Sequence, residues 1–174
     1  MSRSIGNRIR KKLHEAEGYL ELDLPRHCLR ILESRNDWPG LQFEACLIKG
    51  EALRQLNRFR EAIGPLEIAA SLRPSDSGVA LALGWCYKRT NRLAQAIDSL
   101  EAARRNHPDN PLLHYNLACY WSLAGNLGRA IDELHCALEL EPDLRNRLAD
   151  EPDFQQLRGN PDFDRLLLDP APRK

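Results

Sequence analysis

The sequence lacks an excess of charge of either sign. Its 174 residues include 25 lysines and arginines and 25 aspartates and glutamates. Dedicated nucleic-acid binders usually carry a basic excess, so no nucleic-acid partner is expected. The charge is uneven along the chain, because residues 1–60 hold 12 basic and 8 acidic residues whereas residues 132–165 hold 10 acidic and 4 basic ones. We interpret this as variation along a solvated surface; the alternative is weak head-to-tail self-association between chains.

Long apolar runs are missing as well. No stretch approaches the roughly 20 apolar residues that a membrane-spanning helix needs. The first 20 residues are basic and lack the apolar core of a secretory signal, so no membrane partner is expected. The five cysteines are odd in number and widely spaced, which does not suggest a disulfide framework. A reducing, cytoplasmic location is therefore expected.

Recognisable catalytic and metal-binding patterns are also lacking. None of the five histidines stands at a zinc-ligand spacing from another histidine, a cysteine or a carboxylate. A glycine-rich phosphate loop and a nucleophile elbow are missing too. Cys119 is the one thiol expected near a binding surface, but His114 lies five residues before it, off the favoured helical spacings. We therefore expect no enzymatic activity, no cofactor and no metal site.

What the sequence does contain is an internal repeat with a period of 34 residues. One column of this register is leucine in all four copies, a second is branched aliphatic, and two are small; three of the copies also share an alanine and a proline. The leucine column is Leu32, Leu66, Leu100 and Leu134, and one small column is Ala16, Gly50, Gly84 and Ala118. Agreement at six columns in one register is the signature of stacked helical repeats.

Each column has a physical reason. A small residue inside the first helix of a repeat lets the second helix approach closely, and the aliphatic columns fill the space between helices. Proline ends a unit, because it removes a backbone donor and disfavours helix in the residue before it. The expected turn within each unit falls at Asp23-Leu24, Asn57-Arg58, Asn91-Arg92 and Gly125-Asn126. Pro65 falls inside an expected helix, which should therefore be kinked or should start late, near Pro65.

These columns resemble the tetratricopeptide repeat, most fully in the third unit, with Leu83-Gly84, Tyr87, Ala96, Leu100, Ala103 and Pro108. The resemblance implies an all-α, right-handed α-solenoid of about four helix-turn-helix repeats. We divide the chain into an N-terminal segment with a degenerate first repeat (1–42), repeats at 43–76, 77–110 and 111–144, a helical C-terminal cap (145–169) and a tail (170–174). Phe154, Leu157, Phe163 and Leu166 are expected to cover the apolar end of the array, as in the end-of-group segment of bacterial proteins of this kind.

The resemblance also implies a function, which is to bind a protein or peptide on a concave groove lined by the first helix of each unit. Trp85 is the favoured anchor, because its neighbour Gly84 should face the paired helix and Trp85 should point elsewhere. We predict a non-catalytic adaptor or scaffold that holds a peptide or an amphipathic helix. The alternative is a structural or self-associating subunit of a larger assembly without a peptide ligand. The predicted groove residues are Leu47, Ile48, Glu51, Leu81, Trp85, Lys88, Arg89, Tyr115, Asn116 and Cys119.

Overall fold

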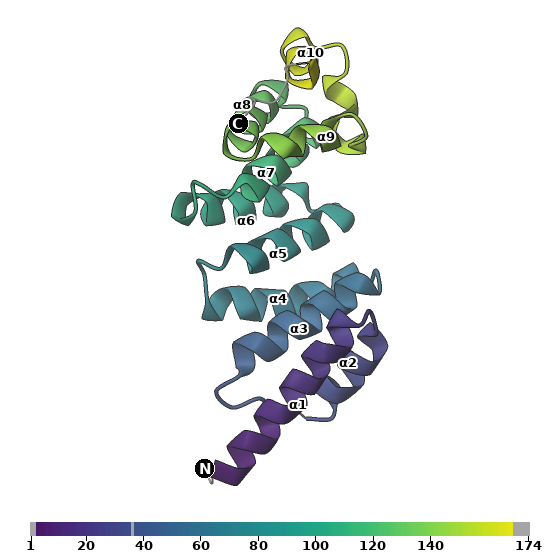
Figure 1. Cartoon of the computed structure of the whole chain (residues 1–174), viewed down its shortest axis with the longest axis vertical. Helices are drawn as coiled ribbons and strands as arrows, with labels where there is room; N and C mark the ends of the chain where they lie inside the picture. Colours follow the sequence, from purple (N-terminus) through teal and green to yellow (C-terminus); the bar gives the residue numbers. More distant parts are fainter. Residues whose placement is uncertain (1–2, 36, 169–174) are drawn as a thin grey trace. The chain divides into compact units, whose positions relative to one another are not determined.

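The computed structural model describes residues 3–35 and 37–168, so the predicted tail at 170–174 lies outside the described residues. Within those ranges every regular element is helical (Figure 1). Eight helices form the repeats and four short elements follow them. They are α1 (Arg3–Glu21), α2 (Pro25–Glu33), α3 (Gln42–Gln55), α4 (Phe59–Leu72), α5 (Ser77–Arg89), α6 (Leu93–Asn106), α7 (Pro111–Leu123), α8 (Leu127–Leu140), η1 (Pro142–Leu144), α9 (Arg145–Leu148), η2 (Pro152–Leu157) and α10 (Pro161–Leu168).

The chain forms two compact units, residues 1–91 and residues 92–174. In the first unit, α1 packs on α2 and α3 packs on α4; in the second, α7 packs on α8. The predicted all-α repeat fold is confirmed. In the described part of the chain, no helix is both long enough and apolar enough to cross a membrane.

The turns between paired helices are built alike. Asp23, Asn57 and Asn91 adopt φ of 57°, 58° and 62°, and Gly125 adopts 78°. This left-handed conformation is open to glycine and to short polar side chains. The next residue then returns a backbone N–H to the helix that has just ended: Leu24 N donates to Tyr19 O, Arg58 N to Leu53 O and Asn126 N to Trp121 O, each at 2.9 Å. These bonds satisfy carbonyls at the helix end, so each turn depends on one residue that can adopt a positive φ.

The small-residue column works as expected in the second repeat. A Cβ added to Gly50 of α3 would lie 2.5 Å from Leu66 Cδ2 of α4. Real Cβ atoms do not approach side chains this closely, so glycine is what lets α4 seat Leu66 against α3. Leu66 itself is fully buried. One column residue therefore fixes the approach of the two helices.

The helix that contains Pro65 was expected either to be kinked or to start late, and it does not start late. α4 begins at Phe59 and runs through Pro65 without interruption, so a late start near Pro65 is wrong. Proline at this place removes one bond, the one its N–H would have donated to the carbonyl of Glu61. Glu61 is exposed, and water can satisfy a carbonyl on an exposed turn. The buried residues Ile63 and Leu66 on either side of Pro65 hold the helix in place.

The C-terminal segment folds over the end of the second unit. Phe154 of η2 and Phe163 of α10 are fully buried, with their ring centroids 5.7 Å apart. η2 packs against α7, and Ser122 Oγ of α7 donates to the carbonyl of Asp153 at 2.7 Å. The predicted covering residues Phe154, Leu157, Phe163 and Leu166 are all buried. The predicted helical cap consists of 3-10 turns and short α-helices, and proline is the first residue of η1, η2 and α10.

Candidate protein-interaction surface

In the first unit, the first helices of successive repeats lie side by side. α3 contacts both α1 and α5, while α2 and α4 are the second helices of their repeats. Arg54 and Glu51 of α3 lie close enough to Cys86 of α5 to act electrostatically on the pKa of its thiol. Side chains of α3 and α5 that are not used in packing therefore share one surface.

On α3, the predicted residues divide into packing and accessible ones. Ile48 is buried, with 8% of its surface exposed, whereas Leu47 and Glu51 are half-buried. The Glu51 carboxylate accepts two bonds from the Arg54 guanidinium, at 2.8 Å from Nε and 2.7 Å from Nη2. α3 thus presents a leucine next to a compact ion pair.

On α5, the accessible side chains include Trp85 and Lys88, whose ammonium group lies over the Trp85 ring. Trp85 is 37% exposed, although it lies on a helix whose neighbouring residues Gly84 and Cys86 are buried. Lys88 Nζ lies 4.7 Å from the centroid of the Trp85 ring, and Leu81, one turn earlier, is half-buried. Arg89 points elsewhere, with its guanidinium carbon 5.1 Å from the Phe59 ring centroid. We call Leu47, Glu51, Leu81, Trp85 and Lys88 the inner-helix face.

The predicted residues of the second unit are less accessible than expected. Tyr115 and Cys119 of α7 are each only 3% exposed. The Tyr115 ring meets the Phe154 ring edge-on, with the ring centroids 5.7 Å apart, and the Arg147 guanidinium lies 5.4 Å from the Tyr115 ring centroid. Burial raises the pKa of the Tyr115 hydroxyl well above its ordinary value. The expectation that both side chains face an open surface is therefore corrected, because the C-terminal segment occupies that place.

Asn116 is the one predicted residue of this unit that is half-buried. Its Nδ2 donates to the carbonyl of Leu112 at 2.8 Å, within its own helix. The amide oxygen and the second hydrogen of Nδ2 are left for a partner. This makes Asn116 a weaker anchor than Trp85.

Close to Cys119, two carboxylates gather. The ligand-capable atoms of Cys119, Glu151 and Asp153 all lie within 4.8 Å of one another. Glu151 Oε1 accepts from the backbone N–H of Asp153 at 3.3 Å, and Glu151 Oε2 lies 3.5 Å from the Tyr115 hydroxyl. Both carboxylate oxygens of Glu151 therefore have protein donors, and the cluster helps to fasten η2 to α7.

A buried histidine was missed by the sequence reasoning. His114 of α7 is 4% exposed. Its Nδ1 lies 2.6 Å from Glu133 Oε2 of α8, and its Nε2 lies 2.8 Å from the carbonyl oxygen of Pro108. Glu133 is 19 positions from His114, so only the pairing of α7 with α8 brings the two together, and no local spacing could have revealed this contact.

The cysteines differ in accessibility. Cys28, Cys46, Cys86 and Cys119 are buried, whereas Cys136 is exposed. Burial raises the pKa of the Cys28 and Cys86 thiols to about 11. Thiols that stay protonated are poor nucleophiles, which suits packing between helices.

Comparison with known proteins supports the repeat assignment. The family model of the tetratricopeptide repeat matches residues 47–111 and 81–144. Among solved structures, a crystal structure of MamA is similar, with a TM-score of 0.73 and 21% identity, covering 80% of this chain and 82% of that one. A structure of MamA AMB-1 gives 0.72 and 20%, covering 91% and 90%, and residues 41 to the end of MamA from Desulfovibrio magneticus RS-1 give 0.72 and 19%, covering 80% and 79%.

No curated protein matches the chain significantly in sequence. At these sequence identities, the similarity to solved structures supports the fold and nothing further. The family model, in contrast, spans more than half of the chain in the register that the 34-residue columns define. The chain belongs to the tetratricopeptide repeat family.

Proposed function

We propose that this protein is a non-catalytic interaction module that binds an extended peptide or an amphipathic helix of another protein on its inner-helix face. The observation that carries the proposal is the exposure of Trp85. More than a third of the surface of Trp85 stays accessible on a helix that otherwise packs, and exposed aromatic residues are favoured anchors in protein interfaces.

The surroundings of Trp85 suit such a ligand. Leu47 and Leu81 are half-buried and offer apolar contact beside it. Lys88 stands over the ring at 4.7 Å, and the Glu51–Arg54 pair supplies both charges on the neighbouring helix. An apolar centre with polar groups around it is the usual arrangement of a protein interface. The ligand expected here presents one large apolar side chain to Trp85 and polar groups to Glu51 and Lys88.

The test is a selection of peptides from a displayed random library on the full chain, followed by calorimetry. Trp85→Ala should melt at the same temperature as the wild type. It should weaken binding of the selected peptide by about 2 kcal/mol, which is roughly thirtyfold in Kd. Leu72→Ala is the matched control, because Leu72 is 49% exposed and lies on α4, the second helix of its repeat; it should leave the affinity unchanged.

Two outcomes would contradict the proposal. Unfolding of Trp85→Ala would show that the ring is needed for the core. A Trp85→Ala protein that melts normally and binds every selected peptide as well as the wild type would remove the inner-helix face as the site, and a structural or self-associating subunit would become the better account.

A further inference from the structure

A second surface of the first unit lies at the turns, away from the inner-helix face. Three hollows of about 380, 420 and 290 Å³ follow one another there. The first two share Arg26 and Leu56, and the last two share Arg58. The hollows therefore adjoin one another from the α1–α2 turn, past the α3–α4 turn, to the end of α5. We call this row of hollows the arginine furrow, after its lining residues Arg26, Arg30, Arg58, Arg60 and Arg89.

Most of these guanidinium groups are uncommitted. Arg26, Arg30 and Arg60 make no hydrogen bond or ion pair with any residue in the described part of the chain, and Arg89 stacks on Phe59. Arg58 shows what the furrow can hold, because its Nε and Nη2 take the two oxygens of Glu61 at 2.8 and 2.6 Å. Guanidinium groups are suited to such two-pronged recognition of carboxylates.

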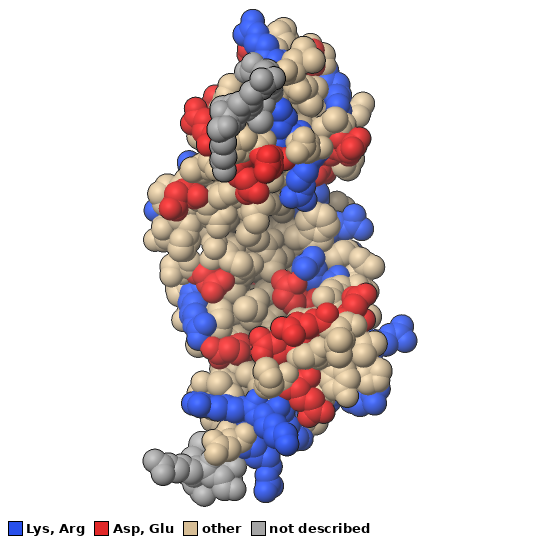
Figure 2. Space-filling model, viewed as in Figure 1, with Lys and Arg blue, Asp and Glu red and all other residues tan. Residues whose placement is uncertain are grey.

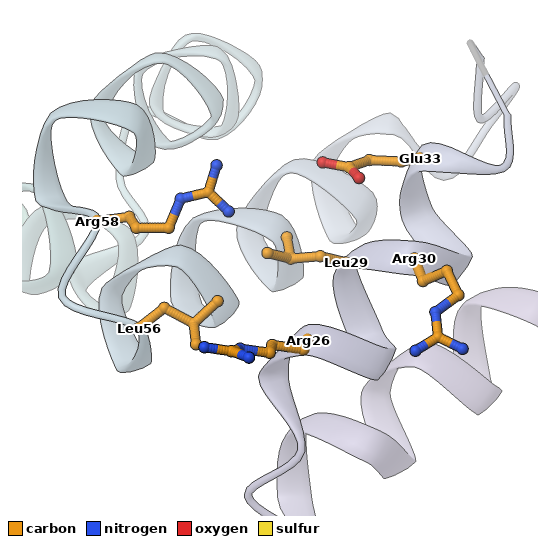
Figure 3. Close-up of a pocket in the computed structure, with 6 residues that line it drawn as sticks. All are labelled: Arg26, Leu29, Arg30, Glu33, Leu56 and Arg58. Carbon is orange, nitrogen blue, oxygen red and sulfur yellow. The ribbon is translucent and has the colours of Figure 1, made fainter.

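The floor of the furrow is apolar. Figure 3 shows Leu29 in the middle, with Arg58 and Glu33 reaching toward it from two sides and Arg26 beside Leu56, while the guanidinium of Arg30 turns away. Leu29 is 4% exposed and Leu56 is half-buried. An apolar side chain of a ligand would find contact here between two cationic groups.

The balance of charge points to the class of ligand. Five arginines border the furrow, although the guanidinium of Arg30 turns away from it. Three carboxylates border it too, those of Asp23, Glu33 and Glu61. A nucleic acid presents a phosphate charge at every step and would meet these carboxylates. A polypeptide can instead place its acidic side chains at the arginines and its apolar ones on Leu29 and Leu56.

We propose that the arginine furrow binds an acidic protein segment in which carboxylate side chains alternate with apolar ones. This interaction is separate from the one proposed for the inner-helix face. The two surfaces lie on different parts of the same repeats, since Trp85, Leu81 and Leu47 are not among the furrow residues.

The experiment uses the full chain and a fluorescein-labelled synthetic peptide of repeated Glu-Ser-Leu-Gly units, followed by fluorescence anisotropy. Arg26→Gln/Arg60→Gln removes two uncommitted cations and should raise the Kd about tenfold. Arg10→Gln/Arg105→Gln is the matched control, because both residues are exposed outside the furrow and the net charge changes equally; its Kd should stay within about twofold. The same peptide with Gln in place of Glu should bind much more weakly than the original.

Four results would overturn the proposal. One is no measurable binding of the Glu peptide at low salt, and another is an equal loss in the two double variants, which would mean attraction by net charge alone. Tighter binding of a labelled oligothymidylate, lost in Arg26→Gln/Arg60→Gln, would assign the furrow to nucleic acid. Loss of Glu-peptide binding in Trp85→Ala would place that peptide on the inner-helix face; retention there keeps the two proposals independent.

Discussion

His114 Nδ1 lies 2.6 Å from Glu133 Oε2, and this contact joins α7 to α8 inside the second unit. The other ring nitrogen faces a backbone carbonyl, which can only accept, so Nε2 carries a hydrogen. The Nδ1–Oε2 contact joins a histidine and a carboxylate that are both shielded from water, with side-chain exposures of 5% and 13%. Arg104 Nη1 is 3.7 Å from the same carboxylate and adds a positive charge beside it.

Removing His114 should destabilise the protein. His114→Leu leaves the Glu133 carboxylate and the Pro108 carbonyl without their donor, which should lower the free energy of unfolding by about 1–3 kcal/mol. Urea unfolding measures the change. His135→Gln is the control, because His135 is exposed on α8, and it should stay within about 0.5 kcal/mol of the wild type. Equal stability of the two variants would show that the buried contacts contribute nothing.

Adding one methyl group to Gly50 should also be costly. In Gly50→Ala the new Cβ would meet Leu66 at 2.5 Å, so α3 and α4 must separate or Leu66 must leave its rotamer, at about 1–3 kcal/mol. Gly18→Ala in α1 is the matched substitution, because nothing lies within 4 Å of its Cβ. Since alanine is the better helix former, Gly18→Ala should raise the melting temperature slightly. A neutral Gly50→Ala would mean that the helix pair is looser than the structure shows.

The C-terminal segment should protect α7 from solvent. Phe154→Ala removes a fully buried ring that packs on Tyr115 and Phe163, so we expect a loss of about 3–5 kcal/mol. Tyr115 and Cys119 should become accessible, which alkylation of Cys119 detects by mass spectrometry. Leu168→Ala, at a side chain that is 82% exposed, is the control and should change neither measurement.

The thiols should show a defined order of reactivity. In the native protein near neutral pH, iodoacetamide should label Cys136, the exposed cysteine, and spare Cys28 and Cys86; in urea all five should react. The folded protein keeps the Cys28 and Cys86 thiols protonated up to about pH 11, against an ordinary pKa of 9.0. Their contribution to stability is therefore present below pH 9 and is lost as the pH rises toward 11.

A double variant without both buried thiols checks this pH dependence. Cys28→Ala/Cys86→Ala should show a smaller drop in the urea midpoint between pH 9 and about 11 than the wild type. An identical drop in both proteins would assign the effect to other groups. Labelling of Cys28 at the rate of Cys136 would instead mean that the first repeat opens readily.

The leucine and alanine columns made the repeat helices predictable, because a buried position recurs whenever the same helix pair recurs. Leu66, Leu100 and Leu134 are all fully buried. The predicted late start of the helix near Pro65 was wrong, since local propensity does not weigh one lost hydrogen bond against the burial of Ile63 and Leu66. The covering role of Phe154 and Phe163 was also readable, because apolar residues follow the last repeat and need a place to pack.

The candidate site was harder to predict than the fold. Trp85 was placed on an accessible face by the burial of its neighbour Gly84, and the structure agrees on its exposure. Tyr115, like Trp85, lies on the first helix of its repeat. The residue that covers Tyr115 is Phe154, which comes from outside the 34-residue register. Arg89 was predicted as a groove residue, but the other furrow arginines were not predicted to bind a partner, because Arg26, Arg58 and Arg89 belong to different repeats and meet only at the turns.

The turn residues have a consequence for how such a chain can change in length. Asp23, Asn57, Asn91 and Gly125 follow one another at 34-residue steps with the same sign of φ. A recombination event that joins one turn to another would therefore always leave a residue able to take that angle at the junction. Whole repeats can be gained, lost or exchanged without a new joint having to evolve. These four positions are accordingly the places at which to cut and splice when chimaeric arrays are built from this protein.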